Sequence, residues 1–354
     1  MNLFDPLAQR SLALRHRLVI SPMCQYSATD GLPDNWHLVH LGSRAVGGAA
    51  LVITEATAVS AQGRISHGDT GLWNDAQVEA WKPIVRFVQS SGAIAGVQLA
   101  HAGRKSSAQL PWEGGGSLAA DQAPWTTVAP SVIPFDAGWH TPQALDEAGI
   151  QQVVADFRAS ARRALAAGFQ LIELHAAHGY LLHQFLSPLS NQRTDPYGGS
   201  FDNRTRIVRE VISAVREVWP AELPLWLRIS ATDWAENDAG WNIEQSVQLA
   251  QQVKPLGVDL IDVSSGGMLA HAKIPVGPGY QVPFAARIRR EADIATGAVG
   301  MITEVEQAQA IIANGEADVV LTARESLRDP YFARRAAKTL DVKITPPVQY
   351  GRAW

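Results

Sequence analysis

Eight short apolar runs, each followed by a segment with helical periodicity, constrain the fold of this 354-residue chain most strongly. The runs are nearly continuous in apolar residues, as strands buried on both faces are. They span residues 17–20, 50–55, 94–99, 169–174, 225–229, 258–263, 294–299 and 318–321. The helical segments span residues 36–46, 76–90, 145–166, 202–218, 243–254, 282–291, 304–314 and 330–340. Eight alternating units predict an α/β fold, a single (β/α)8 barrel of the TIM type over residues 1–354.

A doubly wound parallel sheet is the alternative arrangement of the same units. No Gly-x-Gly-x-x-Gly turn follows the first predicted strand, which weakens this alternative. Helix ends are also marked in the sequence. Gly168 and Gly257 follow predicted helices, and Thr303 is predicted to cap the helix that starts at residue 304.

The longest excursion between predicted elements spans residues 105–145 and is rich in Gly, Pro and Trp. It follows the third predicted strand. In a barrel, loops after strands lie on the face that carries the active site. We therefore expect this excursion to cover the catalytic face as a hairpin or a lid.

The composition excludes several classes of protein. Hydrophobic residues make up 46% and charged residues 18% of the chain, and the net charge is −4 without long runs of one sign. This composition indicates a globular protein with neither a nucleic-acid-binding nor a membrane-binding surface. No apolar run is long enough to span a bilayer. Cys24 is the only cysteine, so an intrachain disulfide is impossible and a reducing, cytoplasmic location is expected.

The most specific chemical signal is the sequence ELHAAHGY at residues 173–180, at the end of the fourth predicted strand. His175 and His178 are spaced so that both imidazoles can donate to one small anionic or carbonyl oxygen. Tyr180 can reach the same ligand and give it a proton. A polar cover for the strand end is the alternative interpretation. The combination of two histidines and a tyrosine after an apolar strand favours a catalytic role.

Polar and small residues follow the other predicted strands as well, so that all would meet at one rim of a barrel. Loops after the last two strands of such barrels commonly bind phosphate. Gly300 allows close backbone approach there, and Arg324 can bind phosphate through two N–H groups, although an ordinary turn and a surface arginine would look the same. With a phosphate-bearing cofactor across the barrel mouth, Gln98 could bond a flat heterocycle and Arg228 could stabilise negative charge on it.

Five segments in order resemble the Old Yellow Enzyme family of FMN-dependent ene-reductases, in particular its thermophilic-like class. They are SPMCQY at 21–26, QLAHAGRK at 98–105, HAAHGY at 175–180, SPLSNQRTDPYGGSFDNRTR at 187–206 and VQYGRAW at 348–354. The resemblance covers nearly the whole chain. It implies a barrel with non-covalent FMN at its mouth and NADPH or NADH as the hydride donor.

The resemblance also implies a role for individual residues. His175 and His178 would bind the substrate carbonyl oxygen, Tyr180 would donate the proton, and Tyr26 would be a second phenol over the flavin. The residues implied to contact FMN are Ser21, Pro22, Met23, Cys24, Ala58, Gln98, Arg228, Gly300, Ala323 and Arg324. The family often has Gly where this chain has Ala323, and that methyl group would crowd the phosphate. Cys24 would tune the flavin potential, or it would be a small buried apolar residue.

By the same resemblance, the substrate is an α,β-unsaturated carbonyl compound. Reduced FMN would deliver hydride to its β-carbon while Tyr180 protonates the α-carbon. The C-terminal tail, residues 345–354, would reach into a neighbouring subunit of a homodimer or a tetramer of dimers, with Arg352 lining the neighbour's active site. A solvated chain end is the alternative for this tail.

Two rival functions remain open from the sequence. A metal-dependent barrel hydrolase could use His175 and His178 as ligands, but it needs a third ligand, and the strand ends offer few acids apart from Glu55 and Asp262. A non-catalytic flavin-binding protein is the other rival. Relatives with an iron–sulfur cluster are excluded because one cysteine cannot hold the cluster.

Overall fold

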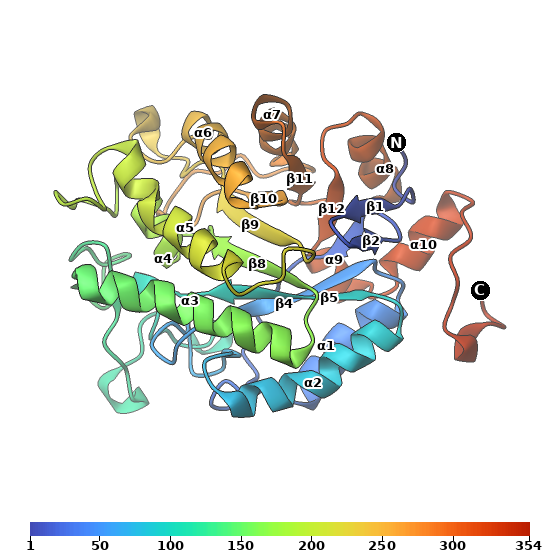
Figure 1. The fold of residues 1–354 in the computed structure, drawn as a ribbon, viewed down its shortest axis with the longest axis horizontal. Helices are drawn as coiled ribbons and strands as arrows, with labels where there is room; N and C mark the ends of the chain where they lie inside the picture. The colour runs from blue at the N-terminus through green and yellow to red at the C-terminus, as the bar shows by residue number, and fades with distance from the viewer.

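The computed structural model describes the backbone of residues 1–354 and the side chains of residues 1–237 and 239–354. Its centre is a closed barrel of eight parallel strands surrounded by helices (Figure 1). Around the barrel the strands are β3 (Leu18–Ile20), β4 (Leu51–Ala58), β5 (Ile94–Ala100), β8 (Leu171–Ala176), β9 (Leu225–Ser230), β10 (Leu260–Ser264), β11 (Ala295–Ala298) and β12 (Val319–Thr322). Because β12 pairs with β3, the sheet has no edge. The (β/α)8 prediction is confirmed, with every strand where the sequence indicated it, and the doubly wound alternative is wrong.

Helices follow the strands along the chain, and all eight predicted helices are present. They are α1 (Asn35–Val46), α2 (Asp75–Ser90), α3 (Glu147–Ala167), α5 (Phe201–Arg216), α6 (Ile243–Val253), α7 (Val282–Ala292), α8 (Val305–Ala313) and α10 (Phe332–Thr339). Two short helices, α4 (Leu181–Leu186) and α9 (Arg324–Arg328), were not predicted. Short 3₁₀ turns span Gly103–Lys105, Pro111–Glu113, Ala120–Gln122, Glu236–Asp238, Lys254–Leu256 and Val348–Tyr350. No helix in the described part of the chain is both long and apolar enough to cross a membrane.

The predicted helix ends are correct except at one helix. Gly168 ends α3 in the left-handed conformation with φ of 93°, and Gly257 ends the turn after α6 in the same way with φ of 95°. Thr303, in contrast, is not the cap of α8. The helix begins one residue later than predicted, at Val305, and Glu304 takes the cap position without a side-chain bond to the helix. The Thr303 hydroxyl bonds the Glu304 carboxylate instead, at 3.3 Å.

The interior of the barrel is apolar at the end where the strands begin. A cluster of buried side chains from most of the strands fills it: Leu14, Val19, Ala50, Leu51, Ile53, Leu171, Trp226, Leu260, Val299, Val319 and Leu321. Leu14 belongs to a small antiparallel pair, β1 (Leu7–Gln9) and β2 (Leu12–Leu14), that closes this end. The Trp226 indole donates to the Gln9 side chain at 2.5 Å. The closed end leaves the opposite rim, where the strands end, for chemistry.

The excursion after the third barrel strand covers the catalytic rim, as expected, but it is not a hairpin. Its two short strands, β6 (Val128–Ala129) and β7 (Gln143–Ala144), pair in parallel. The Arg104 side chain at its start donates to the carbonyls of Pro134 at 3.2 Å and Met268 at 3.0 Å. These bonds tie the excursion to the loop that follows β10. The excursion therefore forms a wall of the active-site mouth.

Candidate active site

His175, His178 and Tyr180 lie together at the carboxyl end of β8. The His175 ring is 5.1 Å from the His178 ring and 5.0 Å from the Tyr180 ring, measured between centroids, and both pairs meet edge to face. His175 is the last but one residue of β8, and the loop after it holds His178 at φ of 57°. This left-handed residue turns the chain back toward the rim. The structure thus brings together the three residues that the sequence singled out.

Hydrogen bonds to the two imidazoles decide which ring nitrogen can donate to a ligand. The Nδ1 atom of His175 accepts the Ala177 backbone N–H at 3.3 Å, so the proton of a neutral ring lies on Nε2. The Nε2 atom of His178 lies 2.7 Å from the Ser264 hydroxyl, which leaves Nδ1 as the ring nitrogen that can face a ligand. Burial, reinforced by the charge of Arg228, holds the pKa of both histidines well below the usual value. Both rings are therefore neutral single donors at pH 7.

Tyr180 is suited to hold a proton. Burial raises the pKa of its phenol well above the usual value, and the nearby Cys24 and Asp69 add to this shift. The pKa of Tyr26 is raised as well, first by Cys24 and then by burial. Tyr26 lies on the excursion side of the rim, where Trp112 meets its ring edge to face at 6.2 Å. Both phenols stay protonated at neutral pH, as a proton donor requires.

Lys105 holds the histidine loop against the loop that follows β10. Its ammonium donates to the His178 carbonyl at 2.9 Å and to the Gly267 carbonyl at 3.1 Å. The same ammonium lies over the Tyr180 ring, 5.2 Å from the centroid. Burial, with the charge of Arg104, lowers the pKa of Lys105 to about 8. One side chain thus bridges the two loops that carry the donor cluster and its neighbour.

The loop after β10 approaches the histidine loop so closely that position 267 must be glycine, and its replacement should disturb ligand binding. A Cβ atom on Gly267 would lie 2.6 Å from the Cα atom of His178, and φ is 88°. Gly199 is a matched control, because its φ is 78° but nothing lies within 4 Å of an added Cβ. Both Ala variants should lose about 1–3 kcal/mol of stability from the strained backbone. The probe is 4-hydroxybenzaldehyde, a phenol whose oxygen His175 and His178 would bind. Only Gly267→Ala should weaken its binding in a spectroscopic titration; equal binding by both variants would contradict this role of the loop contact.

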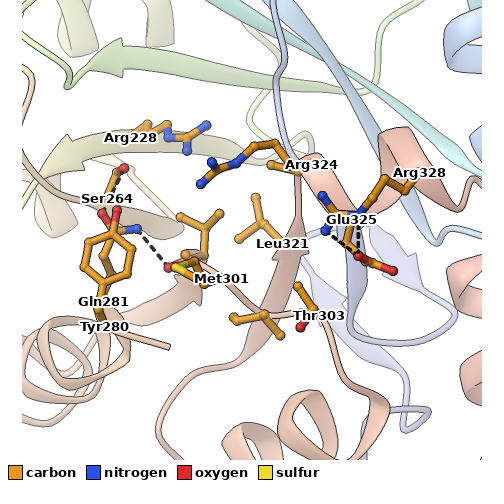
Figure 2. Close-up of a pocket in the computed structure, with 14 residues that line it drawn as sticks. Arg228, Ser264, Tyr280, Gln281, Met301, Thr303, Leu321, Arg324, Glu325 and Arg328 are labelled. Atoms are coloured by element: carbon orange, nitrogen blue, oxygen red, sulfur yellow. Dashed lines mark hydrogen bonds and ion pairs between the residues drawn. The ribbon is translucent and has the colours of Figure 1, made fainter. Parts of the chain in front are cut away.

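The phosphate site predicted from the last two strands coincides with an open pocket of about 270 Å³ (Figure 2). Gly300, Ala323 and Arg324 all line it, and Arg228 lines its other side. Figure 2 shows the guanidinium groups of Arg228 and Arg324 directed into the same space. The remaining lining residues are Ser264, Tyr280, Gln281, Val299, Met301, Ile302, Thr303, Leu321, Glu325 and Arg328. Arg328 is paired with Glu325 at 2.6 Å, which leaves Arg228 and Arg324 as the two cations directed into the pocket. Together with several hydroxyl and amide groups and apolar side chains, they suit a phosphate that is attached to a larger ring system.

Gln98 and Arg228 lie below the rim in the barrel interior. The Gln98 amide donates to the Glu173 carboxyl at 2.8 Å. Arg228 donates to the Ser21 hydroxyl at 3.1 Å, and its Nε atom lies 3.3 Å from the Asp262 carboxylate. Ser21, which directly follows β3, is therefore linked to Arg228 of β9.

The remaining residues predicted at the flavin lie on the same side of the barrel. Pro22, Met23 and Cys24 continue from β3 and are half-buried, and Ala58 is buried at the end of β4.

Arg352, which is predicted to line a neighbouring subunit's site, is exposed and lies away from this rim. The tail that carries it lines two grooves beside Arg15, Gly92 and Lys338, near the beginnings of the strands. In Figure 1 the tail leaves the body on the side of β1 and β2, at the opposite end of the barrel from the excursion.

Four residues of the site had no distinct signal in the sequence. Lys105 and Ser264 contact the histidine loop across 73 and 86 residues of chain. Gln281 bonds the Ser265 hydroxyl at 2.7 Å and the Val299 carbonyl at 2.9 Å. Glu173 was read only as part of its strand. The sequence shows that these residues lie at strand ends or near glycine-rich loops. It does not show their partners, because these come from distant parts of the chain.

A comparison with known families and proteins identifies the chain. Residues 2–343 match the family described as NADH:flavin oxidoreductase / NADH oxidase. The chain belongs to this family. It is an FMN-dependent oxidoreductase of the Old Yellow Enzyme type, as the five sequence segments implied.

Individual relatives agree with this assignment. An NADPH dehydrogenase of Listeria innocua is 51% identical over 100% of this chain and 99% of its own length. An NADPH dehydrogenase of Geobacillus sp. strain WCH70 is 50% identical over 99% of this chain and 98% of its own. Among solved structures, morphinone reductase in complex with tetrahydroNAD is 29% identical with a TM-score of 0.79, and the match covers 98% of this chain and 93% of that one.

The acids available to a metal-dependent hydrolase have other partners. Glu55 accepts the backbone N–H of Gln25 at 2.9 Å and lies 3.2 Å from the His37 ring. Asp262 is paired with Arg228. Among the described side chains, no three or more of His, Cys, Asp and Glu lie together so that they could hold a metal ion. The geometry thus gives His175 and His178 no third ligand.

Proposed function

We propose that this protein is an NADPH-dependent ene-reductase that reduces the C=C bond of α,β-unsaturated carbonyl compounds. The observation that carries the proposal is the cluster of His175, His178 and Tyr180 at the rim that also holds the Arg228–Arg324 pocket. The named NADPH dehydrogenases at about half identity support NADPH as the donor.

The residues at the pocket fit FMN. Arg324, the Gly300 loop and Ala323 would hold the phosphate, while Gln98 and Arg228 would face the pyrimidine end of the ring. The backbone of 21–24 and Ala58 would line the ring, with the Cys24 thiol beside it. When bound, FMN supplies the chemistry that accepts hydride from NADPH and passes it to the substrate.

The chain's own residues would polarise and protonate the substrate. The two neutral imidazoles donate to the carbonyl oxygen and stabilise the negative charge that develops there, an effect worth about 3 to 4 kcal/mol per donor in comparable sites. Electron density drawn to this oxygen makes the β-carbon electrophilic. Tyr180 then gives its proton to the α-carbon, and Tyr26 provides a second phenol over the same site.

Release of the cofactor is the first test of this proposal. Denaturation of the purified protein should release FMN and leave a colourless chain, because polar contacts to the phosphate are lost on unfolding whereas a covalent bond would be kept. Chromatography of the supernatant distinguishes FMN from FAD. Release of FAD, or flavin that stays with the chain, would contradict the proposed site.

A flavin oxidoreductase that does not reduce enones is the remaining alternative, and the His–His–Tyr cluster disfavours it. Such a protein has no need for two neutral donors and a protonated phenol on one turn. It would be reduced by NADPH, but an enone would not reoxidise it.

We further propose a homodimer, or a tetramer of such dimers, in which Arg352 lines the partner's active site. The support is the placement of residues 345–354 near the strand beginnings, away from the catalytic rim of the same chain. The tail also exposes apolar side chains, with Val348 89% and Trp354 48% exposed. Exposed apolar side chains at a chain end are expected where another subunit covers them.

Deletion of residues 349–354 should raise KM for the enone by about tenfold, since a lost hydrogen bond to a charged group costs about 1.5–3 kcal/mol. It should also weaken the dimer in sedimentation. The Arg352→Ala variant separates the two effects, because it should raise KM and leave the assembly intact. Wild-type kinetics and assembly in the truncated chain would show that the tail is a solvated end.

A further inference from the structure

Two acidic side chains are buried in the barrel interior, one layer below the rim. Side chains alternate along a strand, so Glu173 points to the same side as Leu171, and Asp262 to the same side as Leu260. Both leucines belong to the apolar cluster inside the barrel. Glu173 and Asp262 are each 0% exposed. In the strand register, Gln98 lies opposite Glu173 and Arg228 lies opposite Asp262.

The polar contacts of this layer leave one proton unaccounted for. Gln98 donates to one oxygen of Glu173, at 2.8 Å, and the other Glu173 oxygen has no hydrogen-bond donor among the described residues. Both Asp262 oxygens also lack a donor with good geometry in the described part of the chain, although Arg228 is 3.3 Å away. The two carboxyl groups lie on β8 and β10, the strands that flank β9, and β9 carries Arg228. A proton on the free Glu173 oxygen leaves one negative charge, on Asp262, beside the guanidinium.

The charges in this layer support the same conclusion. Two ionised carboxylates beside one guanidinium would leave an uncompensated buried negative charge, which is strongly unfavourable. Burial and the negative charge of Asp262 raise the pKa of Glu173 well above its usual value. Burial raises the pKa of Asp262 too, but Arg228 opposes this shift and Glu173 lowers it further by hydrogen bonding. The neutral member of the pair is therefore Glu173, and Asp262 is the counter-ion of Arg228.

We propose that Glu173 and Asp262 form a positioning pair that keeps one proton in the barrel interior and gives Arg228 a single counter-ion, and that this pair sets the flavin reduction potential. Neither carboxyl group contacts the flavin in this proposal. Asp262 acts through Arg228, which faces the pyrimidine end, and Glu173 acts through Gln98, whose amide it orients. The effect on the potential rests on the proposed placement of the flavin, whereas the shared proton does not.

Two isosteric variants separate the roles. In the double variant Asp262→Asn, Glu173→Gln, Arg228 loses its counter-ion and no second carboxyl group can replace it, so the site becomes more positive and reduced anionic flavin is favoured. The equilibrium constant for two-electron reduction should rise at least tenfold, which is about 30 mV. In Glu173→Gln alone, a neutral amide replaces a neutral acid and can accept from Gln98 as the acid does. Its reduction equilibrium should stay within about threefold of wild type, which is under about 15 mV.

The potentials are measured by dye equilibration at pH 7. A Glu173→Gln shift as large as that of the double variant would show that Glu173 is ionised in the wild type, and unchanged potentials in both variants would show that the pair has no influence on the flavin. Either result overturns the proposal.

The proton can be detected in protein without flavin. The result therefore does not depend on the proposed function, and it does not require a folded double variant. The infrared spectrum of wild-type apoprotein at pH 7 should contain the C=O stretch of a protonated carboxyl group. This band should shift in D₂O and lose intensity in Glu173→Gln apoprotein; any contribution of Asp69, whose pKa burial raises to about 7, is common to both proteins and cancels in the difference spectrum. A difference spectrum without a protonated-carboxyl band would overturn the assignment of the proton to Glu173.

Discussion

Replacement of both His175 and His178 by Ala should abolish measurable phenolate binding and lower kcat/KM for a simple enone by at least a thousandfold. Each imidazole supplies one donor to the oxygen on which charge develops, and loss of one such donor typically lowers the rate about 10²- to 10³-fold. The two effects are not expected to add fully, because the rings touch and share a ligand. Titration with 4-hydroxybenzaldehyde and steady-state kinetics with cyclohexenone measure the two losses.

The control for this variant is reduction of the flavin by NADPH. Bound FMN content should remain near wild type, since no contact of either imidazole with the phosphate pocket is proposed. Phenolate affinity that equals wild type would contradict the substrate-binding role and support the alternative that the two histidines merely cover a strand end.

Tyr180→Phe should slow the half-reaction with a weakly activated enone by about 10²- to 10⁴-fold, the usual range for loss of a general acid. The half-reaction with NADPH should be unchanged, because acceptance of hydride needs no phenol proton. The raised pKa of Tyr180 adds a pH test: the phenol is the active form, so any fall in rate that is absent from Tyr180→Phe should begin only above the ordinary tyrosine value near 10. Rapid-mixing absorbance at the flavin band measures both halves.

Tyr26→Phe is the matched control, because its phenol lies at the same rim and its pKa is raised as well. Tyr180→Phe should be much slower than Tyr26→Phe in the enone half-reaction. If the two variants are equally slow, the proton comes through Tyr26 or water, and the assignment of Tyr180 is wrong.

The barrel was predictable from the sequence because its strands are buried on both faces and therefore contain little besides apolar residues. The site was predictable where the chemistry lies in consecutive residues, as in residues 175–180. The errors have local causes. Helix α4 is six residues long and entirely buried, so it has neither the length nor the polar face that marks a surface helix. The expected Thr303 cap failed because its hydroxyl bonds a neighbouring side chain instead.

Residues that act through distant partners could not be found from the sequence. In the sequence, Lys105 is simply the second residue of a basic pair with Arg104. The carbonyls that it binds lie more than 70 residues away along the chain. Ser264 looks like any strand-end serine until the barrel closes and brings it to His178. Glu173 was read only as part of its strand. Closure of the barrel brings the Gln98 amide to it.

One anaerobic rapid-mixing experiment tests the central claim that the His–His–Tyr cluster and the flavin pocket form an ene-reductase site. NADPH should bleach the flavin absorbance of the purified protein, and subsequent addition of cyclohexenone should restore it with formation of cyclohexanone. Bleaching by NADPH without recovery on addition of cyclohexenone or a more strongly activated enone would contradict the account and leave a flavin-binding protein without ene-reductase activity.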